Sequence, residues 1–560
     1  MEKTLQSIGE YGTIKHHQKG VETAMAEKFD LDQYCSKTYP QTLEEQIAFL
    51  RDHPFLKNAR AARAERYVDY LTPRYHFVNA EGYMNDPNGF CYWNGRYHLF
   101  FQQLVDRVMV WGHAVSRDLV HWTELPYAIH PDPTENEESS WSGGACTTKD
   151  CASIFYYGHG GHTGLYCQKS RDPLLLNWER TTRGPAIAGD TSEAETHRVP
   201  YAQYPAVYDG TVFFENGKYY AISAGVQRRA DDTFTRQEYL FSSDDLASWH
   251  YEHPFLEDDA FNSIGDDGAC PYLVPIGQDP DSRILLTYSH RFGPQYLLGR
   301  LDRERMKLHI IGGERISNTS MWCGYMAPAA CADKDGAGVP TAVYVMHSFG
   351  HGDCMSLPHK LYLSEFPQRI RVQVSPEVFT LRRNARTVES FTVSAGEEVV
   401  IDAARGSCTE IDVSLDLWQQ NATATLKLFR SEDGRQYTAL NLFPSCGDMY
   451  RLSDDWHVDC ILQLDPTNGS DPKRECRASV PESIAVPLNY MQPLKLRIFL
   501  DQSVIEIFTE RGRSIARRVL PPMGADTVSL TARGNSVSVR EMTVYDMKPI
   551  GKTFSDGDTL

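Results

Sequence analysis

Residues 81–89 have the sequence Glu81-Gly82-Tyr83-Met84-Asn85-Asp86-Pro87-Asn88-Gly89. Asparagine, aspartate, proline and glycine favour turns, so the stretch predicts that Asp86 lies where a strand ends and the chain folds back. Strand-like runs at residues 74–78 and 96–101 flank it, and both are rich in aromatic side chains. A plain hairpin needs no such aromatic residues. Aromatic walls around one anchored carboxylate are typical of a sugar pocket, and we interpret Asp86 as a functional residue.

Length, charge and cysteine content limit the class of protein. A chain of 560 residues is too long for one ordinary core, so we expect two or more domains. The net charge of −18 (56 basic, 74 acidic residues) argues against nucleic acid or an anionic membrane as partner. No apolar run is long enough for a transmembrane helix, and the first residues lack an apolar signal core. With 13 scattered cysteines, this predicts reduced thiols in a cytoplasmic protein.

The first part of the chain, residues 1–72, predicts a helical N-terminal extension. The sequence Thr42-Leu43-Glu44-Glu45 fits a capping box with Thr42 as the cap. Pro54 is expected to end that helix, and Asn58 to cap a second, alanine-rich helix. We expect these helices to brace the following domain. A role in subunit contact or in closing over a pocket is the alternative.

A pattern of serine, aspartate and tryptophan recurs three times in the region that follows. Its copies lie at residues 116–122, 170–178 and 243–249, each after a strand-like run. In each copy the aspartate is expected to hydrogen-bond a turn and the tryptophan to cover the unit. A spacing of about 55 to 75 residues suits four-stranded blades, so the pattern indicates a β-propeller.

Beyond residue 382 the pattern changes to strict alternation of apolar and polar residues. It is clearest in residues 409–415, 424–428, 494–500 and 503–508. Alternation with a period of two predicts half-buried sheet. The fold class is therefore all-β, with a second β domain in which we expect no chemistry.

The stretch around Asp86 resembles the nucleophile motif of glycoside hydrolase family 32, which contains invertases, levanases, inulinases and related fructosyltransferases. The family typically has Trp-Met-Asn-Asp-Pro-Asn-Gly, and Tyr83 replaces the tryptophan here. The resemblance covers roughly residues 74–545. It implies a five-bladed β-propeller over residues 73–382, a β-sandwich over residues 383–560, and a retaining β-fructofuranosidase with Asp86 as nucleophile.

A second carboxylate follows from the same resemblance. The family's Arg-Asp-Pro signature contains an aspartate that steadies the transition state, and the stretch around Asp209 is similar to it. Tyr208 replaces the arginine, so the rigid guanidinium and its several hydrogen-bond donors are absent. Gly210 replaces the proline. Arg171-Asp172-Pro173 matches by letters, but it lies inside the repeat described above. We therefore prefer Asp209 to Asp172.

The third signature, Glu-Cys-Pro, corresponds to Ala269-Cys270-Pro271, so alanine stands at the acid/base position. Alanine cannot protonate a leaving group. The chain is either an engineered Glu→Ala variant, which we favour because the rest of the site is intact, or a natural member that lost the acid or took it from Asp266 or Asp267. General acid–base help is worth about 10²- to 10⁴-fold, so we expect an impaired enzyme.

The resemblance also implies substrate-binding residues and a substrate class. The binding residues are Asn85, Gln102, Trp111, Trp141, Ser142, Tyr208 and Tyr325, the last on the leaving-group side. No metal site and no cofactor are expected. The implied substrate is sucrose, a fructo-oligosaccharide or fructan. A fructosyltransferase forming transferred or cyclic difructose products, and a non-catalytic fructan-binding protein, are the alternatives. The sequence leaves open whether the protein forms a homo-oligomer.

Overall fold

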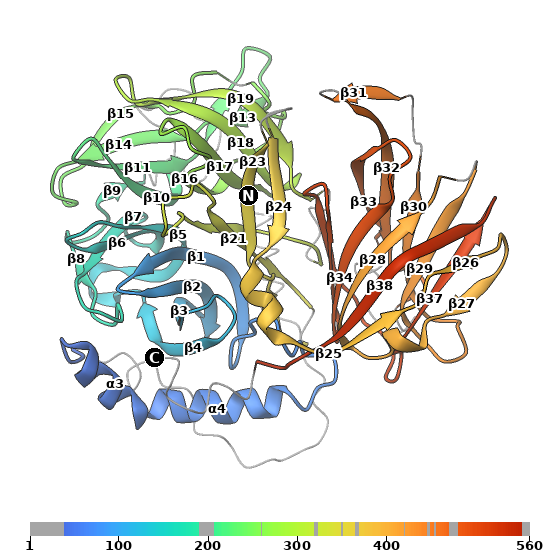
Figure 1. Ribbon diagram of the computed structural model, residues 1–560. Coiled ribbons are helices and arrows are strands. Elements are labelled where there is room, and N and C mark those ends of the chain that lie inside the picture. The colour runs from blue at the N-terminus through green and yellow to red at the C-terminus, as the bar shows by residue number, and fades with distance from the viewer. Residues whose placement is uncertain are drawn as a thin grey trace.

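The computed structural model describes residues 38–189, 207–258, 260–317, 323–348, 351–364, 369–418, 421–444, 449–452, 455–469 and 480–550. Figure 1 shows two β parts side by side, a propeller and an orange-to-red sandwich, with two blue helices along the edge of the propeller. The all-β fold class, the propeller followed by a sandwich, and the N-terminal helices are thereby confirmed.

The propeller is built from antiparallel sheets whose strands follow mostly in chain order. The first sheet contains β1 (Tyr83–Trp93), β2 (Arg96–Val105), β3 (Val108–Ser116) and β4 (Trp122–Ile129). A nine-stranded sheet contains β5 (Glu137–Thr147), β6 (Ala152–Gly160), β7 (Gly164–Ser170), β8 (Glu179–Arg180), β9 (Ile187–Ala188), β10 (Tyr208–Glu215), β11 (Lys218–Ala224), β14 (Tyr239–Ser243) and β15 (His250–Pro254). Its two halves are joined where Gly143 pairs with Gly210 in parallel.

The remaining propeller sheets complete the circle. One contains β16 (Ala269–Pro275), β17 (Ser282–Ser289), β18 (Gly293–Asp302) and β19 (Lys307–Arg315). The other contains β20 (Pro328–Cys331), β21 (Thr341–Met346), β22 (Cys354–Met355), β23 (His359–Ser364) and β24 (Arg369–Val374), and β12 (Val226–Arg228) pairs with β13 (Phe234–Arg236). The innermost strands β1, β5, β10, β16 and β20 contact one another in a ring (Figure 1).

The three repeated Ser-Asp-Trp segments form the predicted turns. Asp118 accepts hydrogen bonds from the Val120 and His121 amides, at 3.1 and 2.8 Å. The tryptophan that closes each copy donates its indole N–H to a leucine carbonyl three residues earlier, at 2.8 to 3.0 Å. Each of these leucines has a positive φ, between 53° and 66°. The aspartate therefore fixes a turn that the tryptophan then covers.

The turn predicted at Asp86 is wrong. Residues 83–93 form the innermost strand β1, and the chain folds back only at Asn94 and Gly95. The turn-forming residues instead produce β-bulges, where the register with β2 shifts between Met84 and Pro87 and again between Asn88 and Cys91. Before β1, the run at residues 74–78 contributes only a bridge from Val78 to Cys354.

Two helices of the N-terminal extension lie against the propeller. In α3 (Leu43–Arg51), Thr42 accepts a hydrogen bond from the Glu45 amide, as the capping box predicts. The helix α4 (Pro54–Arg66) begins at Pro54 with His53 as its cap, so the expectation that Asn58 caps it is wrong. A proline at the first helical position needs no amide partner. Residues 1–37 lie outside the described residues.

Both helices brace the blades. Apolar side chains of α3 and α4, including Leu50 and Phe55, join a buried cluster with Leu125 and Tyr127 of the first sheet. Arg63 pairs with Glu124 on β4, and both side chains are buried. Gln46 donates to Asp172 at 2.9 Å, which ties α3 to the second repeat turn. Among the described residues, no helix has the length and apolar character needed to cross a membrane.

The sandwich consists of two seven-stranded sheets. One contains β25 (Arg382–Val388), β26 (Phe391–Val393), β28 (Cys408–Asp416), β34 (Leu494–Asp501), β35 (Val504–Thr509), β36 (Ser514–Arg518) and β38 (Val537–Met547). The other contains β27 (Glu398–Val400), β29 (Thr423–Arg430), β30 (Thr438–Phe443), β31 (Tyr450–Leu452), β32 (Asp455–Asp465), β33 (Glu482–Asn489) and β37 (Thr527–Arg533). Alternate side chains of both sheets form one buried aliphatic core. This is the period-two pattern that the sequence predicts.

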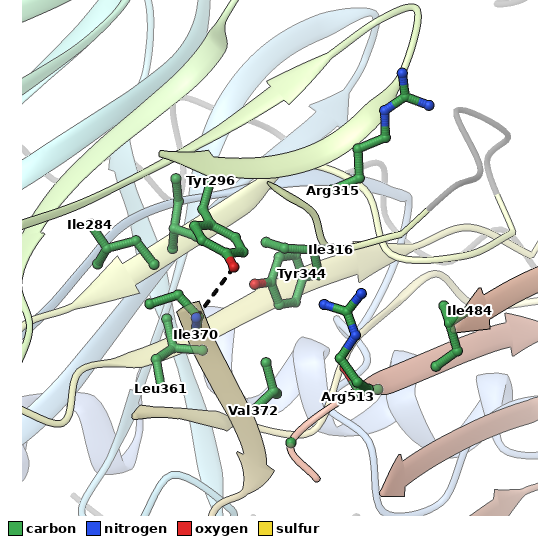
Figure 2. A pocket seen from close by; sticks show the side chains of 13 residues that line it. Ile284, Tyr296, Arg315, Ile316, Tyr344, Leu361, Ile370, Val372, Ile484 and Arg513 are labelled. Carbon is green, nitrogen blue, oxygen red and sulfur yellow. Dashed lines mark hydrogen bonds between the residues drawn. The ribbon is translucent and has the colours of Figure 1, made fainter. Parts of the chain in front are cut away.

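The sandwich packs on the propeller through both apolar and charged contacts. Figure 2 shows a pocket at this junction, lined by Ile484 and Arg513 of the sandwich and by Tyr296 and Ile370 of the propeller. Arg513 also forms a two-pronged ion pair with Glu314 on β19, at 2.5 and 2.6 Å. Such paired Arg–carboxylate contacts fix orientation as well as adding energy, so the two parts are held in one geometry.

Candidate active site

Interruptions of the inner strands position the predicted acids. In β10 the register shifts between Tyr208 and Gly210, so Asp209 occupies a bulge, with a φ of 44°. In β16 it shifts between Ala269 and Tyr272, and Cys270 has a φ of 50°. Together with the bulge of β1 around Asp86, these slips turn side chains out of the normal alternation. Strained backbone of this kind is common at functional sites.

Asp86 lies in a polar cluster at the inner end of three strands. The Ser142 hydroxyl donates to its Oδ2 at 2.5 Å, and the Gln102 amide donates to the same atom at 3.4 Å. Gln102 also donates to Ser142 at 2.6 Å and accepts from Asn85 at 2.8 Å. Four of the predicted residues therefore form one hydrogen-bonded group, which fixes the orientation of the Asp86 carboxylate.

Asp209 approaches the same point from the neighbouring sheet. The Cys270 amide donates to its Oδ2 at 3.2 Å. The Cys270 thiol lies 3.7 Å from that oxygen and 3.5 Å from Oδ2 of Asp86, so one side chain contacts both carboxylates. Burial and the like charge of Asp86 raise the pKa of Asp209 to about 7. A buried acid whose pKa is raised by a neighbouring carboxylate is typical of a catalytic site.

Asp172, the alternative match to the second signature, lies elsewhere. Its carboxylate accepts hydrogen bonds from the backbone amides of Leu174, Leu176 and Asn177, between 2.6 and 3.1 Å, in the repeat turn. It also accepts from Gln46 of α3. These contacts satisfy the carboxylate as a structural turn residue, and they place it outside the cluster around Asp86.

Position 269 lies beside the two acids but carries no acid. Ala269 is buried, precedes Cys270 directly, and pairs with Tyr288 of β17. The hydroxyl of Tyr208, which stands where the family's arginine is expected, donates to the Asp267 carbonyl at 2.5 Å. Tyr208 therefore links β10 to the loop before β16, and no fork of cationic donors faces Asp209 from this position.

The structure brings most, but not all, of the predicted binding residues together. Trp141 is partly exposed next to Ser142, whereas Trp111 is fully buried and donates its indole N–H to the Trp141 carbonyl at 2.7 Å. Trp111 thus supports the site from beneath. Tyr325 lies outside the cluster, because its buried hydroxyl donates to Glu506 of the sandwich at 2.8 Å.

Two residues at the site have no signal in the local sequence. His347, which follows β21, donates its Nε2 hydrogen to Oδ1 of Asn85 at 2.9 Å and stacks on Tyr83, with ring centroids 5.2 Å apart. Cys270, quoted above only as a motif letter, is the contact shared by both acids. Separations of 184 and 262 residues along the chain explain why sequence reasoning could not assign these contacts.

Comparisons with known proteins agree with this geometry. The model of the glycosyl hydrolases family 32 N-terminal domain matches residues 76–368, and the model of the family 32 C-terminal domain matches residues 377–546. The chain belongs to glycosyl hydrolase family 32. It is a glycoside hydrolase of the fructofuranosidase or levanase type.

Relatives of family 32 match most of the chain. A levanase from Bacillus subtilis (strain 168) is 25% identical over 547 residues, covering 89% of this chain and 73% of the levanase. A sucrose-6-phosphate hydrolase from Zymomonas mobilis is 26% identical over 510 residues, covering 85% of this chain and 90% of that enzyme. Fructan 1-exohydrolase IIa from Cichorium intybus has a similar structure, with a TM-score of 0.71, 17% identity, and coverage of 86% and 98%.

The protonation of Asp209 in this family 32 site can be measured directly. Because burial and the Asp86 charge raise its pKa to about 7, the Asp209 carboxyl should titrate near neutral pH. Asp86→Asn removes the like charge, so the Asp209 titration should move to lower pH. Carbon-13 NMR of labelled aspartate, with Asp209→Asn for assignment, follows both. A midpoint near 4 in the unchanged protein would contradict the buried, like-charged environment.

Proposed function

We propose that this family 32 chain cleaves fructosyl linkages in sucrose, fructo-oligosaccharides or fructan by the retaining mechanism. The observation that supports this most is the contact of one thiol with both Asp86 and Asp209. It places two carboxylates around one point at the centre of the propeller. The names of the levanase, sucrose-6-phosphate hydrolase and fructan exohydrolase relatives favour a fructoside as the substrate.

In the proposed mechanism Asp86 acts as the nucleophile. Hydrogen bonds from Ser142 and Gln102 aim its Oδ2, the atom that would attack the anomeric carbon of a fructosyl unit. A covalent fructosyl-enzyme forms as the glycosidic bond breaks, and water then releases fructose. Asp209 stabilises the positive charge that develops on the ring and binds sugar hydroxyls. Ala269 supplies no proton to the leaving oxygen, so we propose that the chain is impaired at that step.

The test is to restore the acid. Ala269→Glu should raise turnover of sucrose, levan or inulin, by up to about 10²- to 10⁴-fold if no other group protonates the leaving oxygen. Released fructose is measured against the double variant Ala269→Glu/Asp209→Asn, which should stay inactive. If Ala269→Glu is inert on every fructoside, the enzymatic proposal fails, and fructan bound without cleavage would then identify a fructan-binding protein. Transferred or cyclised sugars in place of free fructose would identify a transferase.

A further inference from the structure

A histidine–aspartate pair lies at the end of β17, next to the position that lacks its acid. Strand β17 pairs Tyr288 with Ala269, ends at Ser289, and leads directly to His290. The His290 amide donates to Oδ1 of Asp267 at 3.1 Å, and its Nδ1 lies 2.5 Å from Oδ2 of the same carboxylate. Asp267 stands two residues before Ala269. The imidazole is therefore held at the same end of the sheet as position 269.

The imidazole also lies within electrostatic reach of the two acids. The negative charges of Asp267, Asp209 and Asp86 all act on His290. Its ring packs edge-on against Tyr288, with centroids 5.4 Å apart, and the charge of Asp86 also acts on Tyr288. The His290 side chain is 65% exposed, so a bound sugar can touch it.

The hydrogen bond to Asp267 determines which nitrogen is available. With Nδ1 bonded to the carboxylate, Nε2 is directed away from Asp267, and within the described part of the chain it has no hydrogen-bond partner. Partial loss of hydration lowers the pKa of His290, but the hydrogen bond to Asp267 and the charges of Asp267, Asp209 and Asp86 raise it to about 9. The charged form of the ring, which this environment favours, carries a proton on Nε2.

We infer that His290, oriented by Asp267, is the general acid and base that acts in place of the absent glutamate. The inference rests on the proposed function. As an Asp86 oxygen bonds to the anomeric carbon, the bond to the leaving oxygen breaks, and that oxygen keeps the electron pair and takes the proton from Nε2. Neutral His290 then accepts a proton from the water that attacks the fructosyl-enzyme, which restores the imidazolium and releases Asp86.

Other carboxyl groups near position 269 are less suited to this role. Glu238 lies next to Gly268, but it is fully buried and faces Arg236, with Nε 3.8 Å from its Oε1. Asp266 is buried and accepts from the Gly268 amide at 3.1 Å and from Gln295. Neither side chain is exposed to the solvent into which the leaving group departs. Asp267 is engaged by His290, which makes it a positioning residue.

The test compares His290→Asn in two backgrounds and on two substrates. In the unchanged chain, His290→Asn should lower kcat for sucrose or levan by about 10²-fold and leave KM within a few-fold. On 4-nitrophenyl β-fructofuranoside, whose leaving group departs without a proton, the loss should be small. In the Ala269→Glu background, where a carboxylic acid is restored, His290→Asn should cost little on either substrate.

A matched histidine controls for the loss of a charged pair. His309 on β19 pairs with Glu257 at 2.7 Å and is 57% exposed, on the same sheet but away from the acids, so His309→Asn should leave both rates unchanged. The inference is overturned if Ala269→Glu is active but the unchanged chain turns over only the nitrophenyl substrate, or if His290→Asn affects both substrates or both backgrounds equally. If Ala269→Glu is itself inert, the proposed function fails instead.

Discussion

Replacing Asp86 with asparagine should lower fructoside hydrolysis by at least about 10⁴-fold, because losing a nucleophile removes the covalent route. The effect is best measured as kcat in the Ala269→Glu background, where the starting rate is higher. Asparagine keeps the hydrogen-bonding shape, so Ser142 and Gln102 should still hold the side chain in place. The same change should stabilise the fold by about 1 kcal/mol, since it removes a like charge from beside buried Asp209.

Asp172→Asn is the matched control, because it changes the aspartate of Arg171-Asp172-Pro173, the alternative match to the second signature. Asp172 accepts three backbone amides and Gln46 in a buried turn, so its replacement should lower the unfolding free energy and leave kcat of the folded fraction unchanged. Asp86→Asn should therefore lower kcat and raise stability, whereas Asp172→Asn should leave kcat unchanged and lower stability. Equal losses of kcat in both variants would contradict the assignment of Asp86 as nucleophile.

Replacing Glu506 with alanine should lower the unfolding free energy by about 3 to 5 kcal/mol, the usual effect of breaking a buried charged network. Glu506 is fully buried between the sandwich and the propeller. Its carboxylate binds His76 at 2.8 Å, His359 at 3.2 Å, the Tyr325 hydroxyl and the Leu357 amide. Alanine removes one hydrogen-bond partner from each of these four groups.

The same network predicts how stability depends on pH. Burial raises the pKa of Glu506, but hydrogen bonds from His359 and His76 lower it to about 2. Burial lowers the pKa of His76, but hydrogen bonds to Asp501 and Glu506 raise it to about 9. The Glu506 contribution is therefore complete above about pH 4.5 and lost as pH falls through 2, and that of His76 is complete below about 6.5 and lost as pH rises through 9.

Urea unfolding at pH 6 measures the Glu506→Ala effect, with Glu510→Ala as control. Glu510 follows the same strand but is exposed, and among the described residues its carboxylate pairs only with Lys495, at 3.5 Å, so its loss should change stability by no more than about 0.5 kcal/mol. A Glu506→Ala variant as stable as the Glu510→Ala variant would show that the network contributes no stability to the junction.

Local chemistry explains which features of the fold could be predicted from the sequence. The Thr42 cap, the three aspartate turns and the alternating strands of the sandwich each depend on residues within a few positions of one another. The turn predicted at Asp86 failed for the opposite reason. The sequence Asn-Asp-Pro-Asn-Gly disfavours regular β pairing, which can produce either a turn or a shift in register. The pairing with β2 decides between these two outcomes.

The site shows the same division between local and distant information. Motif letters were sufficient to bring Asp86, Asp209 and position 269 together as candidates. Tyr325 could not be placed, because its partner Glu506 is 181 residues away in the sandwich. His290 gave no sequence signal either, since its importance depends on Asp267 across a hairpin and on an alanine in the neighbouring strand.

The register shifts in β1, β10 and β16 set the positions of the site residues locally, so these positions depend little on the rest of each blade. Asp86, Asp209 and position 269 lie at interruptions of one or two residues in these inner strands, while the second and third strands of the same sheets pair without a shift, as in β2 with β3, β11 with β14 and β17 with β18. Changes in the length of the surface loops of the propeller, or substitutions on its surface, therefore need not displace the reacting groups. A scaffold of this type is suited to engineering new glycan preferences by exchanging peripheral segments around an unaltered centre.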